Sequence, residues 1–292
     1  MSQEEENSER VSASSGDREE ISENWDEKTP EDRKAGIPES QKEASEDREG
    51  TPEAQEDLDR RCGQMLEELW EEYHLSPGTP FPRPVIWLSG APGSGKGVNA
   101  GHVRRALGLS AEPVVISELL QSQDSRSRID HGDLVDDLSV IRASLGALLR
   151  AKKGEGLLMD GYPRSLLQAK FLYRLVEKWR TLGAEALQFR MLVFSVDEAT
   201  SLERQLSRGR KAMAHNQEVR RSGKGTLREV RPTDIDETLA RRRYHTFLQE
   251  TDAALRYLQS TGMPFVEIDS RGPFDVVQKR IEQKLRPWVS NS

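Results

Sequence analysis

Short, mostly apolar runs alternate along this chain with longer segments in which apolar residues recur every three or four positions. The apolar runs cover residues 85–88, 113–116, 156–160, 189–194 and 265–269. The longer segments between them have the period of helices with one buried side. Continuous apolar strands separated by helices are typical of a parallel sheet that is buried on both faces. The pattern therefore predicts an α/β fold with a five-stranded parallel sheet and helices on both faces.

Residues 58–82 precede the first predicted strand and read as an amphipathic helix and a linker. Apolar side chains recur on one side of a helix over residues 58–75, and a Pro- and Gly-rich stretch over 76–82 then breaks the chain. The members of this stripe are Leu58, Met65, Leu66, Leu69, Trp70 and Tyr73. The stripe fits either core packing, which we favour, or the binding of a partner helix.

Residues 1–57 lack both patterns. They hold 20 acidic and 7 basic side chains, a net charge of −13, which leaves +6 for the rest of a chain whose total is −7. So few large apolar groups cannot offset the conformational entropy of folding, and we expect a disordered acidic tail. The charge of +6 suits an anionic ligand but is too weak to indicate nucleic acid.

Composition also excludes several classes of protein. A single cysteine, Cys62, rules out an intramolecular disulfide and a multi-cysteine zinc site. No apolar run approaches the length of a membrane span, and the first residues are acidic, unlike the basic start of a signal peptide. We therefore expect a cytoplasmic monomer without zinc, membrane or nucleic acid; a partner for the acidic tail is possible in principle.

The first predicted strand leads into a motif for binding phosphate. Residues 85–88 are followed by three glycines and a lysine that opens a helix, namely Gly90, Gly93, Gly95 and Lys96. Glycines let backbone N–H groups approach a polyphosphate, while the helix N-terminus and the lysine add positive charge. Two other predicted strands end in Asp160 and Asp269, and ligands of such sheets bind at these carboxyl ends. The sequence thus predicts a fold of the P-loop NTPase type.

Several motifs together resemble the adenylate kinases among the nucleoside monophosphate kinases. The loop over 90–97 looks like the family's own P-loop, in which a glycine also follows the lysine. Residues 132–135 resemble the segment that opens the helix over the acceptor nucleotide. Residues 160–164, with Gln168 four positions later, are the most specific match. The resemblance runs from about Val85 to Leu285. It implies an adenylate-kinase-like domain over 83–292, with an acceptor subdomain over about 116–152 and a lid over about 208–232.

The resemblance implies that this chain transfers the γ-phosphoryl group of ATP to AMP with Mg²⁺. Asp160 would hold Mg²⁺ through water. The ATP site would comprise Gly90, Ala91, Pro92, Gly93, Ser94, Gly95, Lys96, Gly97, Val98, Arg204 and Gly272. The AMP site would comprise Ile116, Gln121, Gly161, Arg164, Gln168, Arg231 and Arg243. The catalytic cations would be Lys96, Arg164, Arg204, Arg208, Arg231 and either Arg242 or Arg243, between which alignment does not choose.

The sequence departs from the family pattern at several places. Val98 and Ile116 replace threonines, and Gln121 replaces an arginine that binds the acceptor phosphate. Arg126 or Arg128 could substitute for that arginine. The lid contains an apparent insertion over 211–229, which is either a basic loop over the nucleotide or a solvated surface segment.

These departures keep three hypotheses open. The first is an AMP kinase. The second is a kinase of another nucleoside monophosphate or of a small hydroxyl compound, and the third is a non-catalytic nucleotide-binding protein. The acidic tail is either a solubilising segment or one that lies over the basic site and competes with nucleotide.

Overall fold

A computed structural model describes residues 51–120, 123–131, 134–152, 155–182 and 188–289. Three predictions concern residues outside these ranges. They are the acidic tail up to residue 50, the acceptor-site position Gln121, and the pair 132–133 of the acceptor segment.

The centre of the fold is a five-stranded, all-parallel sheet, as the apolar runs predicted. Its strands are β1 (Val85–Gly90), β2 (Val114–Val115), β3 (Leu157–Asp160), β4 (Phe189–Ser195) and β5 (Phe265–Asp269). They lie in the order β2-β3-β1-β4-β5, so β1 is central and the phosphate-binding loop emerges from the middle of the sheet. Every residue of β1 is buried, which explains its unbroken apolar run.

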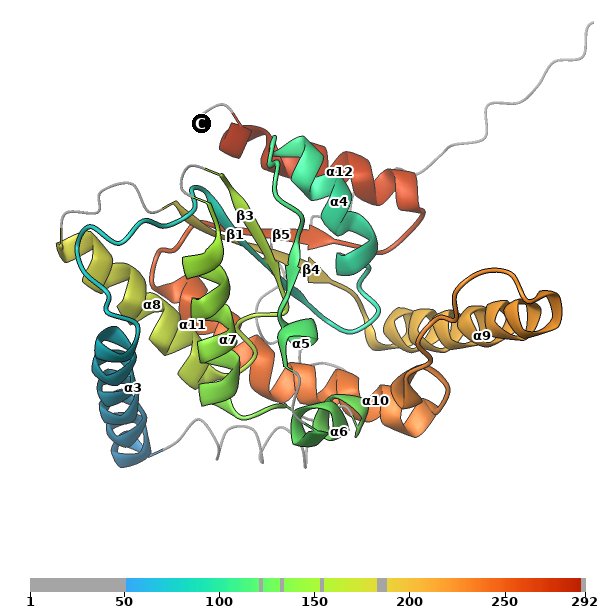
Figure 1. Cartoon of the computed structure of the whole chain (residues 1–292), viewed down its shortest axis with the longest axis horizontal. Coiled ribbons are helices and arrows are strands. Elements are labelled where there is room, and N and C mark those ends of the chain that lie inside the picture. Colours follow the sequence, from blue (N-terminus) through green and yellow to red (C-terminus); the bar gives the residue numbers. More distant parts are fainter. Residues whose placement is uncertain (1–50, 121–122, 132–133, 153–154, 183–187, 290–292) are drawn as a thin grey trace, which may run out of the picture. The chain divides into compact units, whose positions relative to one another are not determined.

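Helices cover both faces of the sheet (Figure 1). On one face, α4 (Lys96–Ala106) and α12 (Phe274–Val289) cover β1 residues such as Ile86 and Leu88. On the other, α7 (Asp137–Arg150), α8 (Leu166–Thr181) and α11 (Asp252–Ser260) cover Val85 and Trp87. Alternate residues of β1 therefore enter different cores, and the prediction of helices on both faces is confirmed.

The helix before the sheet, α3 (Pro52–Glu72), begins six residues earlier than predicted, so the predicted boundary at residue 57 is wrong. Thr51 caps it by accepting a hydrogen bond from the Ala54 N–H at 3.3 Å, and Pro52 opens the first turn. Cap and proline signal a helix start in a polar context, where the apolar stripe gives no signal. The stripe itself packs in the core, with Trp70 and Trp179 of α8 5.0 Å apart.

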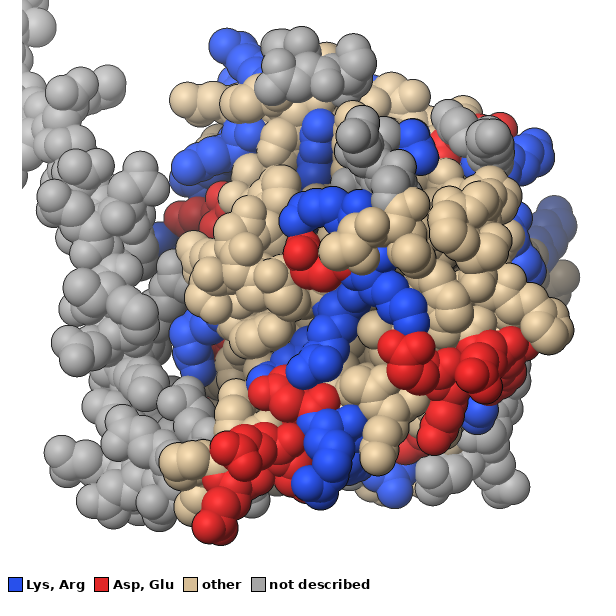
Figure 2. Space-filling view, turned by 90° about the vertical axis from the view of Figure 1, so that its left-hand side faces the viewer, with Lys and Arg blue, Asp and Glu red and all other residues tan. Residues whose placement is uncertain are grey.

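Ion pairs surround this apolar contact. Glu72 pairs with Arg142 of α7 at 2.7 Å, and Glu67 pairs with Lys178 of α8. Acidic and basic side chains also lie beside one another across the face shown in Figure 2. The helix α3 is thus attached to two helices of the sheet's cover by apolar and by charged contacts.

The segment predicted as the lid begins within one long helix, α9 (Glu198–Ser222), which projects from the sheet (Figure 1) and is continuous through Gly209. The chain returns along it to the short η2 (Pro232–Asp234). A Cβ at residue 209 would lie 2.0 Å from the Asp234 carbonyl oxygen, so glycine there serves this close approach. Asn216 pairs in both directions with the Arg228 backbone, at 2.8 and 2.7 Å. The insertion over 211–229 is therefore an ordered helix and its return segment.

Four further helical elements in the described part of the chain lie outside the sheet and its covering helices. They are α5 (Ile116–Leu119), α6 (Gln123–His131), α10 (Glu237–Thr246) and a π-helical turn, η3 (Phe247–Thr251). The helix α6 contacts η2, so the segments predicted as the acceptor subdomain and as the lid contact each other. Among the helices that the structure describes, none is long and apolar enough to cross a membrane.

Candidate active site

The phosphate-binding loop lies between β1 and α4 and is tied to the base of the lid. The Lys96 ammonium donates to the Gly90 carbonyl oxygen at 3.2 Å, which directs it back over the loop. Ser201 of α9 donates its hydroxyl to the Pro92 carbonyl at 2.7 Å. The hydroxyl of Ser94 is buried without a hydrogen-bond partner among the described residues. This arrangement turns the N-terminus of α4, with its free N–H groups, toward the sheet's carboxyl edge.

Lys96 belongs to a group of cations at this edge. Burial is the main cause that lowers the pKa of Lys96 to about 8, and the charges of Arg164, Arg243 and Arg208 lower it further, against the attraction of Asp160. These cations come from the loop after β3, from α10 and from α9. The fold therefore concentrates positive charge beside the phosphate-binding loop.

Arg243 shows the same effect from the opposite side. Its pKa is lowered to about 9 by burial and by repulsion from Arg164, Arg208 and Arg231, with Asp234 acting against this. Burial also lowers the pKa of Arg164, while Asp160 raises it. Cations that repel one another in a buried space are stabilised by a bound polyanion. The cluster of Lys96 and these four arginines is called the cationic cluster below.

The structure distinguishes the two neighbouring arginines of α10. Arg243 is half-buried and belongs to the cationic cluster, whereas Arg242 is exposed. The Arg243 guanidinium donates to the Thr233 hydroxyl at 3.4 Å. Alignment with the family pattern fits either arginine at this position, but only Arg243 is partly buried beside the cationic cluster.

Other lid arginines are held by carboxylates or by backbone carbonyls. The Arg208 guanidinium donates through Nε to Asp234 at 2.8 Å, and that carboxylate is buried. Arg231 donates to Glu229 at 3.0 Å. Sequence analysis missed Asp234; the available signal is an acidic residue three positions after Arg231.

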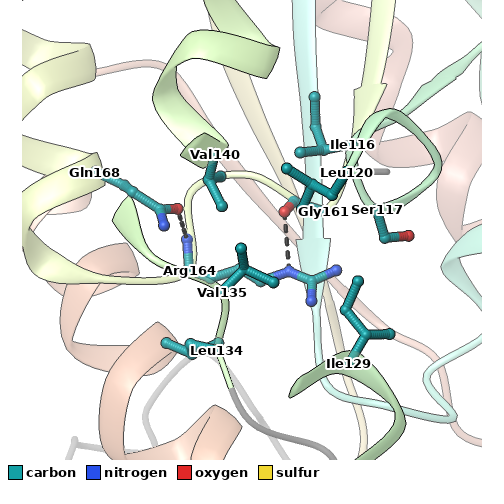
Figure 3. A pocket seen from close by; sticks show the side chains of 10 residues that line it. All are labelled: Ile116, Ser117, Leu120, Ile129, Leu134, Val135, Val140, Gly161, Arg164 and Gln168. Atoms are coloured by element: carbon teal, nitrogen blue, oxygen red, sulfur yellow. Dashed lines mark hydrogen bonds between the residues drawn. The ribbon is translucent and has the colours of Figure 1, made fainter. Parts of the chain in front are cut away.

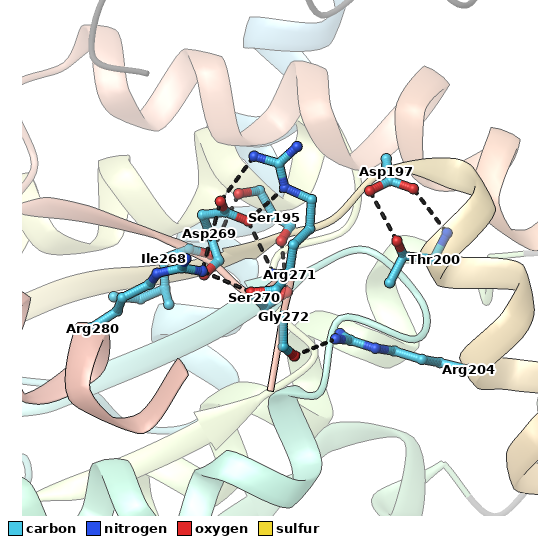
Figure 4. Close-up of polar contacts among 10 residues, drawn as sticks. All are labelled: Ser195, Asp197, Thr200, Arg204, Ile268, Asp269, Ser270, Arg271, Gly272 and Arg280. Atoms are coloured by element: carbon cyan, nitrogen blue, oxygen red, sulfur yellow. Dashed lines mark hydrogen bonds and ion pairs between the residues drawn. The ribbon is translucent and has the colours of Figure 1, made fainter. Parts of the chain in front are cut away.

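Arg204 joins the phosphate-binding loop to the turn after β5. Its guanidinium donates to the Gly93 carbonyl at 3.5 Å. It also donates to the Gly272 carbonyl at 3.4 Å (Figure 4). The same turn is fixed by Asp269, which accepts two hydrogen bonds from the Arg271 guanidinium at 2.9 Å each. Arg280 of α12 donates to the Arg271 carbonyl at 2.7 Å. Sequence analysis found the turn through Gly272 but missed the two arginines that hold it.

Beside the cationic cluster is a partly open pocket, drawn in Figure 3, whose empty space of about 300 Å³ includes open solvent. Its lining is mostly apolar, and Arg164 and Gln168 contribute polar groups. The lining residues are Ile116, Ser117, Leu120, Ile129, Leu134, Val135, Val140, Gly161, Arg164 and Gln168. Four of the predicted acceptor residues thus meet here, namely Ile116, Gly161, Arg164 and Gln168. The suggested substitutes Arg126 and Arg128 lie on α6, where Arg128 donates to the Leu134 carbonyl at 3.5 Å.

Arg164 extends into the pocket over Gly161 (Figure 3). Its Nε donates to the Gly161 carbonyl at 2.9 Å, and a Cβ at residue 161 would lie 2.7 Å from the guanidinium. The Arg164 N–H donates to the Gln168 side-chain oxygen at 2.8 Å. The amide nitrogen of Gln168 donates to Asp137 at 2.9 Å. These two bonds use one of the two N–H groups and one of the two oxygen lone pairs of the Gln168 amide, whose residue is 1% exposed.

Asp160 lies at the carboxyl end of β3 and is 9% exposed. The described residues hold no group of three or more His, Cys, Asp or Glu side chains that could enclose a metal ion. A single buried carboxylate at a phosphate site fits Mg²⁺, which is held by one or two carboxylates, by water and by substrate phosphates. The observed residues therefore suit Mg²⁺ bound together with a nucleotide.

Comparisons with known proteins agree with this arrangement. A family model described as an AAA domain matches residues 89–221. An adenylate kinase from Dehalococcoides mccartyi is 32% identical over 222 residues, which cover 69% of this chain and 97% of that protein. Adenylate kinases from Synechococcus strains WH7803 and CC9311 are 26% and 29% identical, each across 67% of this chain and 95% of the relative.

The chain belongs to the adenylate kinase family. It is therefore a phosphotransferase that binds nucleotides.

Sequence analysis of this adenylate kinase family member also missed Asp137, whose carboxylate contacts the predicted acceptor residue Gln168. Asp137 accepts hydrogen bonds from the Gln168 amide and from the Ser165 hydroxyl, and so joins the first turns of α7 and α8. The available signal is an acidic residue in the first turn of the helix after residues 132–135.

Proposed function

We propose that this chain transfers the γ-phosphoryl group of ATP to AMP in a reaction that requires Mg²⁺. The observation that carries the proposal is the cationic cluster at the carboxyl edge of the sheet, with lowered pKa values for Lys96, Arg164 and Arg243. The cluster lies between a phosphate-binding loop and a mostly apolar pocket. Two nucleotides that meet with their phosphates between these sites would neutralise the cluster.

The donor side is assigned to the phosphate-binding loop. Lys96 and the N–H groups over residues 93–98 bind the β- and γ-phosphates of ATP. Arg204, which contacts both Gly93 and Gly272, closes the site between the loop and the turn after β5. The donor base lies against the backbone of that turn, which the hydrogen bonds of Asp269 keep in place.

The acceptor side is assigned to the pocket. Arg164 binds the AMP phosphate, and the apolar lining receives the base. The second N–H and second lone pair of the Gln168 amide match the edge of adenine, which offers both a donor and an acceptor. The side chain of Ile116, 2% exposed, contributes an apolar contact where the family has a hydroxyl.

Transfer follows from positioning and charge. An oxygen of the AMP phosphate attacks the γ-phosphorus, a new P–O bond forms, and the bond to the β-phosphate oxygen breaks, which leaves two molecules of ADP. Arg208, Arg231 and Arg243 stabilise the charge on the transferring group. Asp160 would hold Mg²⁺ through water, and the bound ion would neutralise part of the phosphate charge. The enzyme's part is to align the two nucleotides and exclude water.

A coupled assay with ATP, Mg²⁺ and each of AMP, UMP, CMP and GMP tests the proposal. We expect the largest kcat/KM for AMP, and loss of turnover in Lys96→Met or when Mg²⁺ is chelated. Faster turnover of another monophosphate would replace AMP as the acceptor. A protein that gains thermal stability with ATP but phosphorylates no acceptor would be a nucleotide-binding protein without kinase activity.

A further inference from the structure

A π-helical turn interrupts the helix that carries Arg243. The segment η3 (Phe247–Thr251) joins α10 to α11, and the Asp252 N–H donates to the Phe247 carbonyl five residues earlier. Such turns contain one residue more than an α-helical turn and occur frequently at functional sites. In this chain the turn lies between a helix that faces the phosphate-binding loop, through Tyr244, and a helix that packs in the core beside α8.

The extra residue changes which side chains share a side of the helix. Arg243 and Thr251 are eight positions apart, so in a regular α-helix their directions would differ by about 80°, at about 100° per residue. A turn with one more residue removes about 100° of rotation, which leaves the two directions about 20° apart. The π turn thus brings Thr251 onto the side of Arg243, toward Arg164, whose charge acts on Arg243.

Thr251 completes the fixation of the Arg164 backbone. The Thr251 hydroxyl donates to the Arg164 carbonyl at 3.0 Å, and Thr251 is only 4% exposed. The Arg164 N–H is held by Gln168 at 2.8 Å and its Nε by the Gly161 carbonyl at 2.9 Å. The peptide groups on both sides of Arg164 therefore have partners, one on α8 and the other on the π turn.

We propose that Thr251 is a positioning residue for the reaction, fixing the Arg164 backbone so that its guanidinium meets the acceptor phosphate. The inference rests on the proposed function, in which Arg164 binds AMP. Without the hydroxyl, the Arg164 carbonyl loses its buried partner and the loop over residues 161–165 is free to shift. A displacement of about 1 Å in a positioned group is enough to slow a reaction strongly.

The test compares Thr251→Val, which keeps the shape and removes the hydroxyl, with Thr251→Ser, which keeps the hydroxyl. Thr251→Val should raise KM and Kd for AMP about three- to tenfold, the value of one hydrogen bond, and leave KM for ATP within about twofold. Thr251→Ser should restore the wild-type AMP values. A purely structural role would lower the melting temperature without this difference between acceptor and donor.

Thr246 offers a matched control on the same helix. Its hydroxyl donates to the Arg242 carbonyl of its own helix at 3.0 Å, so Thr246→Val makes the same chemical change away from Arg164. It should leave KM for AMP unchanged. The inference is overturned if Thr251→Val leaves KM and Kd for AMP unchanged, or if KM rises equally for AMP and ATP. In either case, turnover by the wild-type protein still supports the proposed function. A wild-type protein that neither binds nor phosphorylates AMP overturns both.

Discussion

Replacing Asp59 by Asn tests whether α3 is part of the catalytic domain's core. Asp59 accepts a hydrogen bond from the Lys170 ammonium of α8 at 2.9 Å and lies 3.3 Å from Arg174. The Lys170 side chain is 4% exposed, and its other described contact is the Tyr257 ring, 5.3 Å away. The substitution keeps the shape of the side chain and leaves a buried ammonium without its carboxylate.

The expected loss follows from this burial. Breaking a fully buried pair costs about 3–5 kcal/mol, and because Asp59 is 39% exposed we expect about 2–3 kcal/mol here. For a domain of this size that is a decrease in Tm of about 5–10 °C. Adding Lys170→Met removes the unpaired charge, so the double variant should recover most of the loss.

Urea denaturation measures these differences, and Glu67→Gln is the matched control. Glu67 pairs with Lys178 between the same two helices, but 66% and 23% of these side chains are exposed, so its loss should cost less than about 1 kcal/mol. The Lys170 hydrogen bond lowers the pKa of Asp59, so the stabilisation should be present near neutral pH and fade as pH falls through 3.8 and below. Equal costs for Asp59→Asn and Glu67→Gln would refute the assigned role of the buried pair.

Three further predictions concern the site and the lid. Lys96→Met should raise the unfolding free energy of the nucleotide-free protein by about 1–3 kcal/mol at pH 7 and abolish the ATP-induced increase in Tm. The folded-state pKa of Lys96 is about 8 against an ordinary 10.5, so the unfolding free energy of the wild type should rise toward that of Lys96→Met as pH increases from 8 to 10.5. A difference between the two proteins that stays constant with pH would contradict the lowered pKa of Lys96. Gly209→Ala places a Cβ against the Asp234 carbonyl and should cost about 1–3 kcal/mol in urea unfolding; an unchanged midpoint would mean that the return segment moves freely. Arg243→Ala should lower kcat for AMP about a thousandfold or more, whereas Arg242→Ala should change it less than about threefold, and equal losses would oppose the distinction.

The sheet was predictable because its strands are buried on both faces. The run over 265–269 coincides with β5, and the runs over 85–88 and 189–194 reach the observed strands within two residues. Helix starts in polar sequence were harder to predict. Thr51 and Pro52 begin α3 in a segment with a disordered composition, where capping acts locally and adds no apolar period.

The grouping of candidate site residues at strand ends was also predictable from sequence, because parallel strands bring their carboxyl ends together. Lys96, Asp160 and Arg164 lie near one another for this reason. The supporting residues Asp234 and Thr251 could not be found in that way. Each acts through a contact between distant segments, from η2 to α9 and from the π turn to the loop after β3.

A local signal in the sequence could have predicted which of Arg242 and Arg243 faces the site. Neighbouring residues on a helix point about 100° apart, so only one of the two can face the side that Ala240 and Tyr244 bury. Arg243 is about 60° from Ala240 and 100° from Tyr244, while Arg242 is about 160° from both. Small and aromatic residues at this spacing mark a buried face even where charged residues dominate the sequence. The charge of Arg243 is therefore held against the site by the packing of its apolar neighbours, which makes the arginine part of the cationic cluster before any nucleotide binds.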